Sequence, residues 1–154
     1  IWIRFEWQFS LGAVIALIHD VIITVGIFSF LAYEVNLSIV AAVLTIVGYS
    51  MNDTVVIFDR IRENLKKYSK ISITEISDLS TNQTLSRTLI TSVTTLLALF
   101  SIYIFGGAIL KGFSFAMIIG VIVGTYSSIF VATPILNYTN VNQKTVLKED
   151  TENN

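Results

Sequence analysis

The chain has 154 residues, of which 53% are hydrophobic and only 14% are charged. Soluble domains carry about 25% charged residues, so this composition excludes an ordinary water-facing globule and favours a lipid environment. The net charge of −1 gives no basic patch for nucleic acid, and the absence of cysteine excludes disulfides and cysteine-based metal or redox sites.

Residues 1–10, ahead of the first apolar stretch, include an aromatic cluster that contains Trp2 and Trp7. Aromatic side chains of this kind gather at membrane interfaces. We expect this segment to be the end of a preceding transmembrane helix and a cytoplasmic turn, which implies that part of a longer protein lies upstream. At the other end, residues 138–154 are polar and aperiodic, which predicts a disordered cytoplasmic tail.

Four apolar stretches are each long enough to cross a bilayer, which takes about 20 helical residues. The connections within the first and second pairs are short, which predicts two antiparallel hairpins. The expected fold class is therefore all-α, a polytopic membrane helical bundle of four transmembrane helices. A soluble bundle of buried helices is the alternative, which the length of the stretches disfavours. The predicted spans cover residues 11–33, 37–58, 88–105 and 113–136.

Residues 59–87 form a long charged connection between the hairpins. Ile61, Leu65 and Tyr68 recur there at helical spacing, which predicts that the second helix continues into this cytoplasmic loop as an amphipathic stretch along the membrane surface. Ser72 followed by Glu75 has the spacing of a capping box and predicts the start of a short helix.

The lysines and arginines indicate the orientation of the spans. Nine of the ten fall on the side that carries both termini and the 59–87 connection, and only Lys111 falls on the other side. Because positive residues accumulate on the cytoplasmic side, both termini are expected in the cytoplasm.

Asp53 and Arg87 are ionisable residues in or beside predicted spans, where charges are costly and often functional. Counted from the non-cytoplasmic ends of their helices, Asp53 lies about 24 Å deep and Arg87 about 28 Å deep. At matching depth on neighbouring helices they can pair. Pairing favours the charged carboxylate and burial favours the neutral one, so the balance suits a proton relay. A purely structural ion pair is the alternative.

Further polar residues surround this pair or lie at a similar depth. His19 and Asp20 are secondary candidates, because histidine titrates near physiological pH and Asp20 lies about 20 Å deep. Structural hydrogen bonding is the competing interpretation for both. Hydroxyls on the third span, at three- and four-residue spacing from Arg87, can line a hydrated path or bond across helices. The remaining secondary candidates are Tyr49, Asn52 and Thr91.

The fourth span carries a small residue at every fourth position, which predicts a face for close helix packing. Pro134 is expected to loosen the last turn. No histidine, cysteine, aspartate and glutamate cluster has metal-ligand spacing, and no nucleophile–base arrangement is present, so we expect neither a metal, a cofactor nor enzymatic activity. The packing candidates are Gly120, Gly124 and Ser128.

Residues 48–64, which read GYSMNDTVVIFDRIREN, closely resemble the signature of the SecF family of protein-export subunits. Residues 16–21, 82–88 and 120–128 resemble further segments of that family, in the same order and spacing. The family belongs to the resistance-nodulation-division (RND) superfamily, and its members have six transmembrane helices with a periplasmic domain between the first two. The resemblance implies that this chain corresponds to helices three to six.

The resemblance also implies a function. Members work with SecD beside the SecYEG translocon in the bacterial inner membrane, and use the proton-motive force to drive a preprotein across it. It extends the expected partners to YajC and YidC, besides membrane lipid, and assigns the proton-coupling aspartate and arginine to Asp53 and Arg87. A proton-coupled RND transporter of small molecules and a non-catalytic membrane assembly module are the alternatives.

Overall fold

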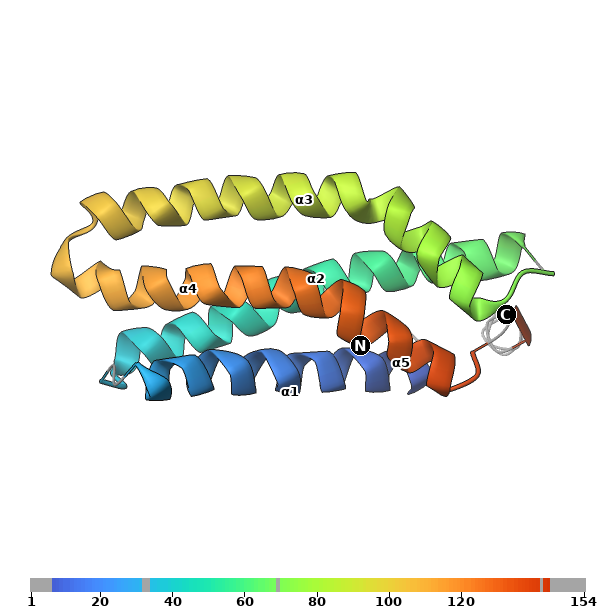
Figure 1. The fold of residues 1–154 in the computed structure, drawn as a ribbon, viewed down its shortest axis with the longest axis horizontal. Coiled ribbons are helices and arrows are strands. Elements are labelled where there is room, and N and C mark those ends of the chain that lie inside the picture. The colour runs from blue at the N-terminus through green and yellow to red at the C-terminus, as the bar shows by residue number, and fades with distance from the viewer. Residues whose placement is uncertain (1–6, 32–33, 69, 142, 145–154) are drawn as a thin grey trace, which may run out of the picture.

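The computed structural model describes residues 7–31, 34–68, 70–141 and 143–144 as a bundle of long helices without a strand (Figure 1). Four helices in this part of the chain are long and apolar enough to cross a membrane, which confirms the predicted fold class. The elements are α1 (Trp7–Phe30), α2 (Leu37–Lys67), α3 (Ile73–Phe105), α4 (Gly107–Ser127), η1 (Ser128–Ala132) and α5 (Thr133–Tyr138).

The helices form the two predicted antiparallel hairpins, α1 with α2 and α3 with α4. Their tight connections lie at one end of the molecule, and the α2–α3 connection lies at the other, beside α5 (Figure 1). Helix α4 contacts α1, α2 and α3, so it is the element around which the bundle is assembled.

The connection between the hairpins is a correction to the sequence interpretation. The expected loop over 59–87 is almost wholly helical: α2 continues to Lys67, as the helical spacing predicted, and α3 already begins at Ile73. The physical reason is that these residues contain no glycine or proline and keep a helical apolar period. Ile61 and Leu65 pack in the protein interior, so protein rather than lipid covers this apolar face.

The predicted capping box at Ser72 is confirmed. The Glu75 amide donates to Ser72 Oγ at 3.3 Å, and the Ser72 amide donates to the Glu75 carboxylate at 3.4 Å. The helix that it begins is not short, however, because the residues after the cap run without interruption into the apolar span.

Two segment predictions need correction. Of the helix end and turn expected over 1–10, residues 7–10 already belong to α1. Of the disordered tail expected over 138–154, Val141 is buried in an apolar cluster and the Gln143 amide donates to the Lys66 carbonyl at 3.3 Å, so these residues pack on the bundle. Residues 1–6, 142 and 145–154 lie outside the described residues.

Buried side chains divide the bundle into three layers. One apolar cluster contains Phe9, Phe58 and Leu136 and lies toward the α2–α3 connection. A second contains Phe28, Ile46 and Val121 and lies toward the hairpin turns. Between them, on every long helix, the buried residues are mostly polar, and we call this the polar layer. It comprises Asp20, Thr24, Ser50, Asp53, Thr54, Thr84, Thr88, Ser92, Ser127 and Ser128.

Helix α4 passes into a π-helical turn, η1, before it resumes as α5. Pro134 lies at the start of α5 and has no amide hydrogen, and its ring clashes with the carbonyl one turn earlier, so an α-turn is disfavoured at this point. The Thr133 hydroxyl donates to the Ser128 carbonyl, five residues back, at 3.2 Å. The predicted loosening at Pro134 is confirmed as this wide turn.

Substitution of Gly120 tests the close approach of α4 and α2. A Cβ atom at Gly120 would lie 2.2 Å from Ile46 Cγ1, and Ile46 is a stiff, β-branched neighbour. We expect overpacking in Gly120→Ala to lower the free energy of unfolding by about 1–3 kcal/mol. The better helix propensity of alanine offsets roughly 0.5–1 kcal/mol of this loss. The measurement is denaturant unfolding of the full-length protein in detergent micelles.

The matched control is Gly26→Ala, because no atom lies within 4 Å of a Cβ built at Gly26. That variant is expected to be as stable as the parent or slightly more stable. Equal stability of the two variants would contradict the close approach at Gly120.

Candidate functional site

Asp53 is the carboxylate that α2 holds inside the polar layer. Its side chain is only 4% exposed, and its Oδ2 atom is buried without a hydrogen-bond partner. The stretch around it is helical because apolar and polar residues alternate at helical spacing without a helix breaker from Leu37 to Lys67. A carboxylate oxygen without a donor in an apolar interior is costly, so Asp53 has an unfilled capacity to bind a proton or a donor group.

Arg87 is the cation whose charge acts on Asp53. It lies on the exposed side of α3, and within the described part of the chain no hydrogen bond or salt bridge joins the two side chains. The structure therefore brings the predicted pair into electrostatic range, but not into contact.

Arg87 lines an open cavity of about 440 Å³ between the second half of α2 and the first half of α3. Asp59 and Glu63 of α2 line the same cavity. The guanidinium is thus placed between a buried carboxylate on one side and surface carboxylates on the other. A side chain as long as arginine can exchange partners in such a position.

Asp20 forms a second polar contact, between α1 and α2. Its side chain is 1% exposed and accepts a hydrogen bond from the Ser50 hydroxyl. The neighbouring His19 ring places Nδ1 3.2 Å from Asp20 Oδ1, and this ring is partly exposed. Ser50 precedes Asp53 by one helical turn, so both polar contacts of α2 lie on the same side of that helix.

Hydroxyl pairs link the remaining helices of the polar layer. Thr54 of α2 and Ser128 of η1 place their hydroxyl oxygens 3.0 Å apart. The Tyr49 hydroxyl donates to Ser92 of α3 at 3.3 Å, and Ser92 in turn lies 2.7 Å from Thr125 of α4. Such pairs satisfy polar groups that the apolar surroundings would otherwise leave without a partner.

The packing candidates on α4 lie against α2. Gly120 faces Ile46, and a Cβ atom at Gly124 would lie 3.2 Å from Ser50 Cβ. Ser128 continues the same face through its bond to Thr54. The absence of side chains at the two glycines allows Ser50 to reach across to Asp20 while α4 covers it.

Two of the secondary candidates lie apart from these contacts. Asn52 is exposed on α2, and the Thr91 hydroxyl donates to the Arg87 carbonyl of its own helix at 2.9 Å. Neither side chain bonds across helices within the described chain. Sequence reasoning overlooked Ser92 and Thr125, although the period-four series Ser80, Thr84, Thr88 and Ser92 was a signal for the buried face of α3.

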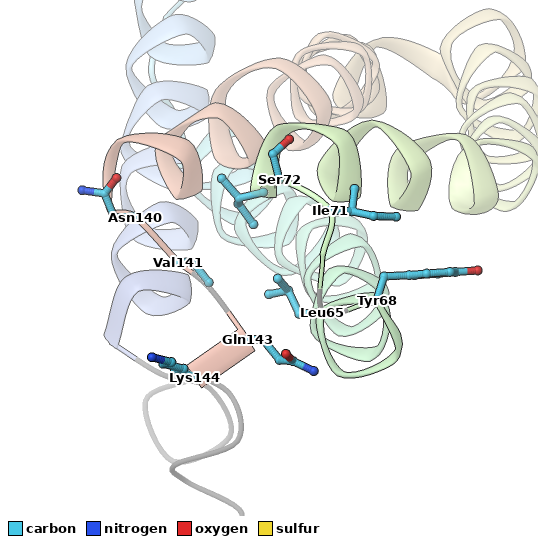
Figure 2. Close-up of a pocket in the computed structure, with 9 residues that line it drawn as sticks. Leu65, Tyr68, Ile71, Ser72, Asn140, Val141, Gln143 and Lys144 are labelled. Carbon is cyan, nitrogen blue, oxygen red and sulfur yellow. The ribbon is translucent and has the colours of Figure 1, made fainter.

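A further pocket of about 490 Å³ lies at the end of the bundle, where α2 meets the start of α3 and the residues after α5 (Figure 2). Leu65 and Val141 lie at its buried side, while Tyr68 and Lys144 extend at its rim. None of the predicted site residues lines it. Within the described residues, no group of three histidine, cysteine, aspartate or glutamate side chains is placed to hold a metal.

Comparison with known proteins places this arrangement in a family. A family model described as "Protein export membrane protein SecD/SecF, C-terminal" matches residues 1–142. The chain belongs to the SecD/SecF family. It is 53% identical over 143 residues to the protein translocase subunit SecF of Cereibacter sphaeroides, and 60% identical over 136 residues to that of Rickettsia bellii. These matches cover 93% and 88% of the chain, but only 44% and 45% of the relatives.

Solved SecDF structures share the fold. A structure of SecDF from Thermus thermophilus, described as a translocon-associated membrane protein, has a TM-score of 0.85 at 44% identity, over 90% of this chain and 20% of that one. SecDF in a super-membrane-facing form has a TM-score of 0.83 at 41% identity, over 98% of this chain and 19% of that one. Together with its four apolar helices, family membership makes this chain part of a multi-pass membrane protein.

The Thr54–Ser128 bond gives a direct test of the polar layer. We expect a double-mutant cycle with Thr54→Val and Ser128→Ala to yield a coupling energy of about 0.5–1 kcal/mol, the usual size for a hydroxyl bond between membrane helices. The readout is unfolding of the full-length protein in detergent. A matched cycle on Thr94→Val and Ser128→Ala should show no coupling, because Thr94 is exposed and bonds only within α3. Additive effects in the first cycle would contradict the bond.

Proposed function

We propose that this chain is the carboxy-terminal membrane part of a SecF subunit, and that it couples the proton-motive force to preprotein export. The family and the SecDF fold support the general assignment. The observation that carries the mechanism is Asp53, a buried carboxylate with one unpartnered oxygen that lies in the field of Arg87 without touching it.

The mechanism follows from the two charge states of Asp53. When it is ionised, the attraction of Arg87 draws α2 and α3 together at the level of the polar layer. When a proton neutralises it, that attraction is lost, and Arg87 can turn toward the carboxylates at its cavity, where Glu63 also pairs with Arg60 at 2.8 Å. A proton that enters from one side of the membrane and leaves on the other would thus alternate the α2–α3 contact. No group in this cycle forms a covalent intermediate, so we infer energy coupling rather than enzymatic catalysis.

The exposed side of the bundle supports SecD as the partner. Helix α3 is the least covered of the four membrane helices, because only 17% of its 18-residue apolar stretch is buried inside the bundle. Its uncovered side carries Arg87, and Asn52 is exposed on the adjacent α2. Lipid would leave these polar groups unsatisfied, so a second helical bundle with polar residues at the same depth is the fitting cover. The assembly would act beside SecYEG, with YajC and YidC as further partners.

The same proposal gives a location and an orientation. The chain would lie in the bacterial inner membrane, with the α2–α3 connection and both termini in the cytoplasm. The distribution of lysine and arginine supports this orientation, because Lys111 is the one such residue, among those that the structure describes, at the end that carries the hairpin turns.

An export assay tests the proton role. In the full-length protein with SecD present, we expect Asp53→Asn to abolish the part of preprotein translocation that depends on the proton gradient, because the asparagine cannot exchange a proton. The rate without a gradient should stay unchanged. The readout is the translocation rate into membrane vesicles with and without a gradient.

Asp78→Asn is the matched control for that assay, because Asp78 is an exposed carboxylate near the start of α3. It should keep the full gradient response. If Asp53→Asn keeps that response while the complex assembles normally, Asp53 is structural and the chain is an assembly module in this respect.

Labelling tests the orientation. The chain has no cysteine, so a single one can be introduced into a full-length protein from which any others have been removed. A membrane-impermeant maleimide added to spheroplasts should modify the Lys111→Cys variant and leave the Lys67→Cys variant unmodified. Both positions are exposed, so the result depends on their side of the membrane. The reverse pattern would overturn the orientation.

A further inference from the structure

Asp20 is a second buried carboxyl group that the proposed cycle does not use. It lies in the middle of α1, about 20 Å along the helix from Trp7 and about 15 Å from Phe30. On the same helix face it is followed by the buried Thr24, and beyond them the face is apolar toward both ends, with Ala16 in one apolar cluster and Phe28 in the other. A carboxyl group that is 1% exposed at this depth needs a specific reason to be there.

The partners of Asp20 are unusual because no permanent cation is among them. Within the described chain its contacts are His19 Nδ1 and the Ser50 hydroxyl, and no lysine or arginine pairs with it. Along α2 the ionisable groups next to Ser50 are Tyr49 and Asp53. Helix α4 brings Gly124 against Ser50, and η1 carries no ionisable side chain. The ionisable groups of α4 and α5 lie elsewhere: Lys111, Tyr126 and Tyr138 are all exposed.

Both partners can reverse their hydrogen bonds. A serine hydroxyl donates to a carboxylate, but it can equally accept a bond from a protonated carboxyl group. The His19 ring nitrogen is a donor or an acceptor according to its tautomer. Asp20 is therefore satisfied both with and without a proton, and this is the condition for reversible proton binding in an apolar interior. Lysine or arginine could serve only the ionised form.

The surroundings also connect Asp20 to the surface of the bundle through His19 and to the neighbouring helices through Ser50. His19 is 31% exposed, so it connects the buried carboxyl group to the outside of the bundle. Ser50 lies one turn, or about 4.5 Å along α2, from Asp53. It also lies against Gly124, so a change in the direction of its hydrogen bond occurs where α1, α2 and α4 meet.

We propose that Asp20 is a second proton-binding residue of the polar layer, with His19 as its proton donor and acceptor and Ser50 as the residue that transmits its protonation state to α2. In each step one proton moves between His19 Nδ1 and Asp20 Oδ1. The neutral carboxyl group then rotates to point its hydroxyl at Ser50, which changes from donor to acceptor. The inference rests on the proposed function for the use made of the proton, whereas proton binding by Asp20 can be measured without any export.

Infrared difference spectroscopy between neutral and acidic pH tests this on the full-length protein with SecD in lipid vesicles. Protonated carboxyl groups give their own carbonyl band. Relative to the Asp53→Asn variant, the double variant Asp20→Asn, Asp53→Asn should lack one component of this band, the one due to Asp20. Asp78→Asn, the exposed control, should leave it unchanged. Identical spectra of the single Asp53→Asn variant and the double variant would overturn the proposal.

Ser50→Ala, in the Asp53→Asn background, distinguishes a proton-binding role of Asp20 from a purely structural one. Loss of the Ser50 hydroxyl should shift the carbonyl band of Asp20 to higher frequency, because its hydrogen bond is gone. His19→Phe should slow the appearance of the band after a pH jump. These readouts also serve if Asp20→Asn fails to assemble, and a band that neither variant alters would overturn the proposal. Gradient-driven export that persists in Asp53→Asn, with the Asp20 band intact, would instead count against the proposed function alone.

Discussion

The polar layer is the constraint on which the rest of this structure depends. Two apolar clusters lie above and below this layer, so the bundle must satisfy hydroxyl and carboxyl groups where lipid and apolar side chains offer no partner. It does so through bonds between helices, such as Thr54 with Ser128 and Ser50 with Asp20. The two apolar clusters hold the helices close enough for these bonds to form.

A layer held by hydroxyl pairs can rearrange at modest cost, because each hydroxyl both donates and accepts. Apolar packing is different, since it loses contact area with any displacement. The bundle thus combines fixed ends with a middle that can change its hydrogen bonds. The layer is incomplete at Thr24, whose hydroxyl has no partner, and at Asp53, with an oxygen that lacks a donor and a cation held at a distance. Charge changes there act on the part of the fold that is able to respond.

The sequence predicted the class of fold well, because the length and hydrophobicity of a membrane span are local properties. The depth of Asp53 and Arg87 followed from counting residues along helices. The continuation of α2 followed from the helical period of its apolar residues, but the burial of this face by protein and the unbroken run of α3 from Ile73 were missed. The partners of Asp20 could not be predicted, because they depend on the rotation of α1 against α2, which Gly124 permits by leaving room for Ser50. Thr91 was predicted as a site residue, but its hydroxyl donates to a carbonyl of its own helix.

The wide turn at η1 has a geometric consequence for the whole of the fourth span. Residues spaced by four on an α-helix drift by about 40° per step, so a buried stripe of this spacing should leave the interior after a few turns. Here Ala116, Gly120, Gly124, Ser128, Ala132 and Leu136 are all buried. The additional residue in the π turn resets the angular phase just before the stripe would rotate outward. The wide turn that Pro134 favours therefore keeps one row of mostly small residues buried along the fourth span, from Ala116 to Leu136.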